Sequence, residues 1–398
     1  MAGPEPSTAA WPVAEHHLRR KILIVVAPFG YGPASKALLI AQALADSADI
    51  TVISSRDAYR FIERFKAGDV VCREGIFHTA FAEAADLAPY DLCISINNEP
   101  AVHHLIDRGL EARTLFVDSI LPWRSAHSRV GFRRPILGYL VQDFPGVASC
   151  LAECRAQTVE LTAPMVWSRP RGDASAAQES RELVLHVGGV TSPLVRWEML
   201  RRPVEATVQH VLALARRTGR RLTEIGSRHL DTSGTAGSDD FRILGDISPP
   251  ETARLLGGAE LLLSTPGIGA VYEAMACGVP TIVLPPMNST QLMQYGVFSD
   301  LGFPGSMSNE ARIALRETAR SIPWDGQTAH CVRFVNRNLS ACVAELPRHM
   351  ESVLAAGGPG PAYAETLRVQ AAFFAALSRA SATDIIRRFL FNESRPGP

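Results

Sequence analysis

The sequence has 398 residues, 46% of them apolar, which is enough to build two domains with separate cores. The 40 Lys and Arg residues balance the 40 Asp and Glu residues, so the zero net charge indicates no polyanionic partner such as nucleic acid. No apolar run reaches the roughly 20 residues of a membrane span. Residues 1–18 read as a disordered lead-in without the pattern of a signal peptide. We therefore expect a cytoplasmic protein, and its seven scattered cysteines are interpreted as reduced thiols.

The first half of the chain, residues 19–165, alternates apolar, β-branched runs with helical patterns. Continuous apolar strands of this kind are typical of a parallel sheet that helices cover on both faces. The pattern therefore predicts an N-terminal Rossmann-like domain. Its strands are expected at residues 21–28, 49–55, 91–96, 113–119 and 158–162.

A polar stretch at 166–182, rich in Ser, Ala and charge, is predicted to be a linker. The alternation then restarts and predicts a second domain over residues 183–360. Helices over 361–398 are expected to pack back on the N-terminal domain. The strands of the second domain are expected at 183–189, 221–227, 241–247, 260–264 and 281–286.

The stretch "STPGIGAVYEAMACGVPTIVLPP", residues 264–286, combines a strand end, a glycine-bearing turn and the start of a helix. Such a turn leaves backbone N–H groups unpaired, and the helix dipole favours an anion such as a phosphate. Gly267 and Gly269 would let a ligand approach the backbone, and Glu273 follows one helical turn later. The alternative is a tight turn in which glycine serves packing alone. A second glycine pair at a strand end, Gly188 and Gly189, favours the ligand.

The segment "STPGIGAVYEAMACGVPTIVLPPMNSTQLMQ" resembles the donor-binding segment of GT-B glycosyltransferases, which use nucleotide-diphosphate sugars. The resemblance implies two Rossmann-like domains facing each other across a cleft. The C-terminal domain would bind a UDP-sugar and the N-terminal domain a small-molecule acceptor. It also implies a diphosphate cradle and a ribose-binding Glu273. The donor-binding residues carried over are Gly188, Gly189, Val190, Arg228, Ile247, Thr265, Pro266, Gly267, Ile268, Gly269, Glu273, Asn288, Thr290 and Gln291.

The first loop of the N-terminal domain, "APFGYGPASKALL", departs from many small-molecule glycosyltransferases of this fold because it lacks their catalytic histidine. In this loop Phe29, Gly30, Tyr31 and Gly32 are predicted to bind the acceptor, with the tyrosine exposed between two glycines. Lys36 could contact a negatively charged group across the cleft, or it could be a solvated helix lysine. The form of this loop is similar to that of cytosylglucuronate synthases, which transfer a sugar from a UDP donor to cytosine. A nucleobase nitrogen is a better nucleophile than an alcohol, so the enzyme could manage with a weaker general base than histidine.

Polar residues follow other predicted strands of the first half and are candidates for acid–base chemistry. Glu99 and Asp118, together with Lys36, are the predicted catalytic residues. Asn97, Asn98 and Asp143 are predicted to bind the acceptor. Each of the carboxylates could instead cap the helix that follows it.

The leading hypothesis is a glycosyltransferase, inverting or retaining, that needs no cofactor beyond the UDP-sugar and no metal, since no Asp-x-Asp pair is present. A sugar-nucleotide epimerase of the same architecture is one alternative. A non-catalytic glycosyltransferase-like partner protein is another, and a homodimer remains open.

Overall fold

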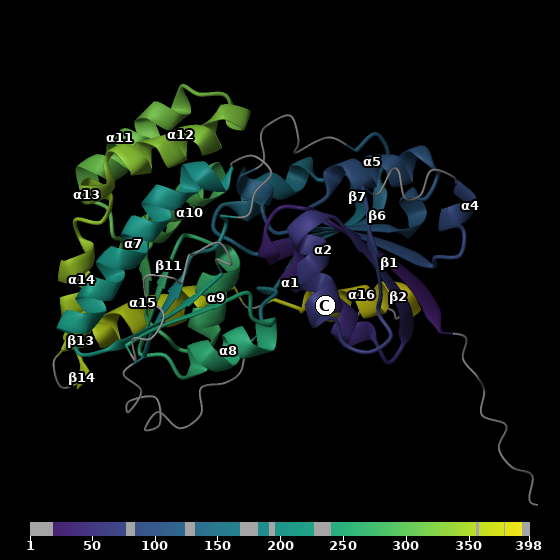
Figure 1. Ribbon diagram of the computed structural model, residues 1–398. Helices are drawn as coiled ribbons and strands as arrows, with labels where there is room; N and C mark the ends of the chain where they lie inside the picture. Colours follow the sequence, from purple (N-terminus) through teal and green to yellow (C-terminus); the bar gives the residue numbers. More distant parts are fainter. Residues whose placement is uncertain are drawn as a thin grey trace, which may run out of the picture.

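The chain forms two α/β domains, each built on a parallel sheet, as the two lobes in Figure 1 show. This computed structural model describes residues 19–76, 84–123, 132–167, 182–190, 196–226, 240–355, 358–377 and 379–391. Among these residues, no helix is both long enough and apolar enough to cross a lipid bilayer. All seven cysteines are free.

The N-terminal domain contains a seven-stranded parallel sheet in the order β3-β2-β1-β4-β5-β6-β7. In β1, Ile22, Ile24 and Val26 pack into one core cluster, whereas Leu23 and Val25 pack into another on the opposite face. Burial on both faces explains the continuous apolar run. The strands are β1 Arg20–Val26, β2 Ala48–Ser54, β3 Val71–Glu74, β4 Leu92–Ile96, β5 Thr114–Asp118, β6 Ile136–Gln142 and β7 Ala156–Thr162. The helices are α1 Tyr31–Leu44, α2 Arg56–Phe65, α4 Ala84–Leu87 and α5 Glu99–Asp107, with 3₁₀ turns at Glu111–Arg113, Leu121–Trp123 and Val147–Glu153.

The edge strand β3 and the internal strand β6 were not among the predicted strands. For β3 the reason lies in its composition. Its sequence, VCRE, is short, charged and mostly exposed, so it carries neither an apolar run nor a clear alternation. Charge on a short edge strand discourages pairing with another chain. A central strand is recognised by an apolar run, and β3 has none.

The C-terminal domain contains a five-stranded parallel sheet in the order β10-β9-β8-β11-β12. Its strands are β8 Glu182–His186, β9 Arg221–Ile225, β10 Phe241–Gly245, β11 Leu261–Ser264 and β12 Thr281–Val283. Its helices are α7 Trp197–Arg217, α8 Pro249–Gly257, α9 Ile268–Ala276, α10 Ser289–Asp300, α11 Asn309–Arg320, α12 Trp324–Arg337, α13 Leu339–Cys342, α14 Leu346–Val353 and α15 Tyr363–Ala376. A small hairpin, β13 Leu354–Ala355 and β14 Gly358–Pro359, separates α14 from α15.

A buried ion pair joins the loops before two strands of this second sheet. Arg220 precedes β9 and Glu260 precedes β11, and the guanidinium binds the carboxylate through two hydrogen bonds of 3.0 and 2.9 Å. Their side chains are 4% and 12% exposed. Each charge therefore depends on the other for its compensation.

The loop after β6 joins the two domains. Phe144, which follows a strand of the N-terminal domain, lies in the core cluster of the C-terminal domain. Its ring centroid is 6.2 Å from that of Tyr272 and 5.8 Å from that of Phe298. The Tyr272 hydroxyl donates to the Asp143 carbonyl at 3.2 Å. One aromatic side chain of the first half thus completes the core of the second.

The chain returns to the N-terminal domain in α16, Ala382–Phe391. Figure 1 shows α15 on the C-terminal lobe and α16 on the N-terminal lobe, both in yellow. Ile385, Ile386 and Leu390 pack into the same core cluster as residues of α1. Arg388 forms an ion pair with Glu160 of β7 at 2.8 Å. Residues far apart in the sequence therefore share one core.

Candidate functional site

The turn from β11 into α9 leaves the start of the helix without a side-chain cap. The N-cap residue, Gly267, has no side chain that could bind the first N–H groups of the helix. In contrast, α8, α10 and α11 are capped by Ser248, Asn288 and Ser308. A Cβ atom placed on Gly269 would meet no atom within 4 Å. The first turn of α9 therefore has no side-chain cap and has free space beside Gly269, an arrangement that suits an anion.

Thr265 fixes the neighbouring loop at the end of β8. Its Oγ1 accepts a hydrogen bond from the Gly188 N–H and donates one to the Gly188 carbonyl, both at 3.0 Å. Gln291 of α10 donates to the same carbonyl at 2.9 Å and accepts from the Met287 N–H at 2.7 Å. The loop is thus tied to both β11 and α10, so its backbone is preorganised.

Gly189 meets this scaffold at close range. It has φ 76°, and a Cβ atom there would lie 2.5 Å from Gln291 Nε2 and 2.7 Å from Asn288 Nδ2. Asn288 caps α10 by accepting from the Gln291 N–H at 2.9 Å. The amides of Asn288 and Gln291, predicted to contact the sugar, here support the loop. Thr290, in the same segment, is partly exposed.

His186, at the end of β8, fills the space beneath two glycine loops. Its Nδ1 lies 3.1 Å from the Ser264 hydroxyl. Cβ atoms on Gly188 and Gly226 would come within 2.4 and 3.1 Å of its ring. Burial lowers the pKa of His186 to about 4, so the ring is neutral at physiological pH. The imidazole leaves no room for a side chain at Gly188 or Gly226, which explains glycine at both positions. The sequence pattern did not indicate this contact.

The remaining donor-binding candidates differ in position. Val190 is buried in the core of the C-terminal domain, and Pro266 and Ile268 are buried at the turn itself. Ile247 is partly buried against the cluster that contains Leu255. Arg228 lies outside the residues that the structure describes.

Glu273 and Lys36 approach each other across the domain boundary. Glu273 lies in α9 and is 8% exposed, whereas Lys36 lies in α1 and is 4% exposed. Burial raises the pKa of Glu273 to about 8, opposed by the Lys36 charge and by a hydrogen bond from the Trp167 backbone. Burial lowers the pKa of Lys36 to about 8, opposed by the charge of Glu273. The two predicted functional residues therefore act on each other electrostatically, although they belong to different domains.

Trp167 contacts this part of the protein and was not among the predicted site residues. It lies in the segment predicted to be a linker, yet its backbone binds Glu273 and its indole N–H donates to the Ser35 carbonyl of α1 at 3.4 Å. A lone aromatic residue in a polar stretch was the available signal.

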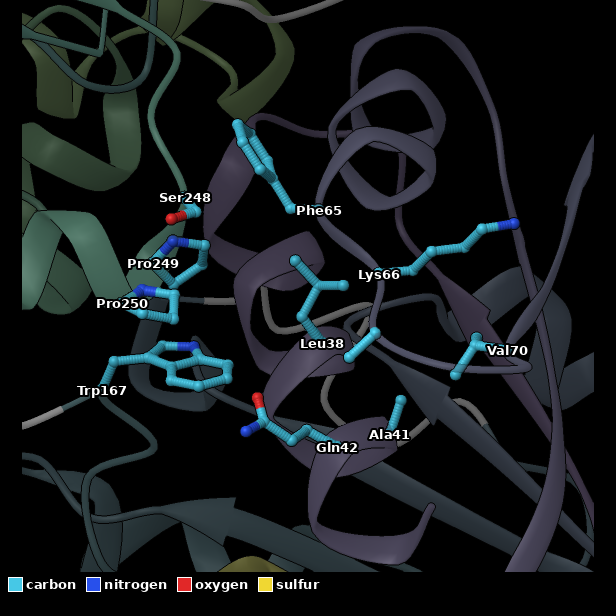
Figure 2. Close-up of a pocket in the computed structure, with 11 residues that line it drawn as sticks. Leu38, Ala41, Gln42, Phe65, Lys66, Val70, Trp167, Ser248, Pro249 and Pro250 are labelled. Atoms are coloured by element: carbon cyan, nitrogen blue, oxygen red, sulfur yellow. The ribbon is translucent and has the colours of Figure 1, made fainter.

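A cavity of about 220 Å³ lies beside Trp167 between the domains, as Figure 2 shows. Its walls are mainly apolar and come from α1, the segment after α2, Trp167 and the start of α8. The lining residues are Leu38, Ala41, Gln42, Phe65, Lys66, Ala67, Val70, Trp167, Ser248, Pro249 and Pro250.

The first loop of the N-terminal domain corrects one expectation. Tyr31 was predicted to be exposed, but it stacks on Phe61 with ring centroids 4.6 Å apart and its hydroxyl is buried. The Tyr31 ring packs against Phe61 of α2. The sequence of the loop alone does not indicate this contact. Phe29 is the exposed aromatic residue, at 48%. Gly30, with φ 65°, is the N-cap of α1, and Gly32 beside it is exposed with open space around its Cα.

The ends of β4 and β5 are linked by side-chain amides. Asn97 has φ 53°; its amide donates to the Ser119 hydroxyl and accepts from the Ser119 N–H, both at 2.9 Å. Asn98 caps α5 by accepting from the Ala101 N–H at 3.2 Å. Glu99 opens that helix, and its carboxylate lies 3.7 Å from His103 Nε2.

Two further carboxylates are engaged within the protein. Asp118 is fully buried and accepts from the Ile120 N–H at 2.8 Å and from the Tyr139 hydroxyl at 2.7 Å. Asp143 lies at the domain junction, 3.3 Å from Arg379, and burial raises its pKa against the attraction of that arginine. Both carboxylates, which were predicted to take part in catalysis or acceptor binding, therefore stabilise the fold through these contacts.

In the part of the chain that the structure describes, no group of three His, Cys, Asp or Glu side chains is placed to hold a metal ion.

Two parallel-sheet domains in this arrangement define the GT-B fold. No family model and no curated protein matches the sequence. Among solved structures, UGT2 of Phytolacca americana, complexed with UDP-2-fluoro-glucose and pterostilbene, is 13% identical with a TM-score of 0.53, covering 94% of this chain and 99% of that one. The glycosyltransferase of kitacinnamycin is 16% identical with a TM-score of 0.51, covering 93% and 99% of the two chains. At these identities the likeness establishes the fold.

Proposed function

We propose that the protein is a glycosyltransferase that moves a sugar from a UDP-sugar to a small-molecule acceptor. The observation that carries the proposal is the uncapped start of α9 beside open space, next to a loop that Thr265 and Gln291 hold in place. Glu273 follows the first turn of that helix, and we propose that its carboxyl binds the ribose diol. Solved proteins of the same fold that are complexed with UDP-sugars support this assignment by analogy.

The reaction would be a displacement at the anomeric carbon of the donor. The bond from that carbon to the phosphate oxygen breaks, and its electron pair leaves with UDP. The acceptor nucleophile forms the new bond and releases a proton. The amides and dipole of α9 would stabilise the charge that develops on the leaving diphosphate. We propose no metal and no cofactor besides the donor.

The acceptor would bind on the N-terminal domain, near the exposed Phe29 and the loop Gly30–Gly32. Glu99 is the proposed base because its carboxylate lies at the carboxyl edge of the sheet beside His103, and the pair could pass on a proton. Asp118 is less suited to this task because both of its oxygens already accept hydrogen bonds.

We further propose a nucleobase such as cytosine as the acceptor and a glucuronosyl group as the sugar, in the synthesis of a nucleoside natural product. The "FGYG" loop and the missing loop histidine support this narrower proposal. A ring nitrogen is a better nucleophile than an alcohol, so a carboxylate base could suffice.

The test is a thermal-shift panel of ADP, GDP, UDP and TDP, followed by product analysis with UDP-glucose and UDP-glucuronic acid. UDP at one hundred times its dissociation constant should stabilise the fold by roughly 2.7 kcal/mol. A larger shift with another nucleotide would refute UDP as the donor nucleotide.

Incubation with donor alone distinguishes the sugar-nucleotide epimerase, which needs no acceptor, from the glycosyltransferase. Donor binding without turnover, over a panel of acceptors that includes cytosine, would favour a non-catalytic partner protein instead.

A further inference from the structure

The Lys36 side chain is almost fully buried, yet it forms no close ion pair with the described residues. The chain has three lysines, Lys21, Lys36 and Lys66, and the Lys36 side chain is 4% exposed. Within the described part of the chain, its ammonium makes no hydrogen bond and no close ion pair. Glu273 is the charged group that acts on it. The ammonium nitrogen is not among the buried polar atoms that lack a partner, so an anion from outside the protein can reach it.

Trp167 joins the helix that carries Lys36 to the helix that carries Glu273: its indole N–H donates to the Ser35 carbonyl of α1 at 3.4 Å, and its backbone binds the Glu273 carboxyl of α9. Side chains on a helix lean toward its amino end, so Lys36 leans toward the start of α1 and Glu273 toward the start of α9. Each of the two charges acts on the other across the domain boundary. Neither α1 nor α9 has a side-chain cap. An uncapped helix amino end carries positive potential, and the lysine adds a further positive charge.

We propose that Lys36 binds the diphosphate of the nucleotide-sugar donor from the N-terminal domain, opposite the amino end of α9. This inference rests on the proposed function and adds a residue to it. As the anomeric bond breaks, its electron pair moves to a phosphate oxygen, and the ammonium stabilises the added charge. Because α1 and α9 belong to different domains, one ligand would hold both domains at once.

The test compares Lys36→Met with the wild-type protein by calorimetric titration of UDP, UMP and uridine. Methionine keeps an unbranched apolar stem of similar length and removes the positive charge. We expect a loss of about 10- to 100-fold in UDP affinity, because hydrogen bonds to charged groups are worth that much. The loss should be smaller for UMP and under about 3-fold for uridine, which carries no phosphate.

The matched control is Lys21→Met. Lys21 is exposed in β1, near the amino end of that strand and therefore at the opposite edge of the sheet. The Lys21→Met substitution removes the same charge at a position far from α9, so the affinity for UDP should not change. An equal loss in both variants would overturn the inference in favour of long-range electrostatics.

Two other outcomes would also overturn it. If Lys36→Met weakens UDP-glucuronic acid but leaves UDP unchanged, the ammonium binds the sugar carboxylate instead. If Lys36→Met has no effect on UDP in a Glu273→Gln background, Lys36 acts only by neutralising that carboxylate. Failure of the wild-type protein to bind any nucleoside diphosphate would refute the proposed function itself, and this inference with it.

Discussion

Substitution of Gly189 by alanine tests whether the glycine loop is held in shape by the contacts described above. Gly189 has φ 76°, in the left-handed region that costs an alanine roughly 1–2 kcal/mol. The new methyl group would also lie 2.5 Å from Gln291 Nε2, which donates to the Gly188 carbonyl. Losing that hydrogen bond or shifting the loop adds roughly 1–3 kcal/mol.

Gly109→Ala is the matched control because it isolates the backbone term. Gly109 has φ 75°, and a Cβ atom there would meet no atom within 4 Å. Both variants should lose the strain energy, and only Gly189→Ala should lose the additional roughly 1–3 kcal/mol. Urea denaturation gives both free energies of unfolding.

The same pair of variants should differ in ligand binding. Gly189→Ala should weaken UDP by about 10-fold, because the displaced loop no longer supports the turn beside α9. Gly109→Ala should leave the affinity unchanged. Equal stability and equal affinity in the two variants would refute the view that Gln291 and Asn288 position this loop.

Three further predictions concern buried groups and are all measured by chemical denaturation. Because the pKa of Glu273 is raised from 4.5 to about 8, its contribution to folding is fully present below pH 4.5 and is lost as the pH rises toward 8. Glu273→Gln should therefore gain stability relative to wild type between pH 5 and pH 8, and a pH-independent difference would contradict this. Phe144→Ala should cost about 3–5 kcal/mol, against about 0.5 for the exposed Phe29→Ala. Similar losses for the two phenylalanines would contradict the role of Phe144 at the junction. Arg220→Met should cost about 3–5 kcal/mol by leaving Glu260 unpaired, and Arg220→Met with Glu260→Leu should recover most of it. No recovery in the double variant would show that the arginine acts through other contacts.

The two sheets could be predicted because burial on both faces leaves a direct trace in sequence. The run Ile22–Val26 and the run Leu261–Ser264 have no polar alternation, and each leads into a glycine-bearing turn before a helix. A buried strand and the turn that follows it are determined mainly by residues that are adjacent in the sequence. The uncapped start of α9 was predictable for the same reason.

The contacts between the domains could not be predicted in this way. Phe144 follows a strand of one domain and packs in the core of the other, and nothing in its neighbours indicates this destination. Trp167 lies in a polar segment but binds both α1 and Glu273. Asn288 and Gln291 have the chemistry of sugar ligands, and only the position of Gly189 shows that their amides face the loop.

The return of α16 to the first lobe has a consequence for biosynthesis. A ribosome that has released the first seven strands has not yet made Ile385 and Ile386, which complete their core. Until those residues emerge, the nascent N-terminal domain must expose the apolar surface that they will cover. Its maturation therefore waits for translation of the other domain, and premature termination before α16 would yield a product prone to aggregation.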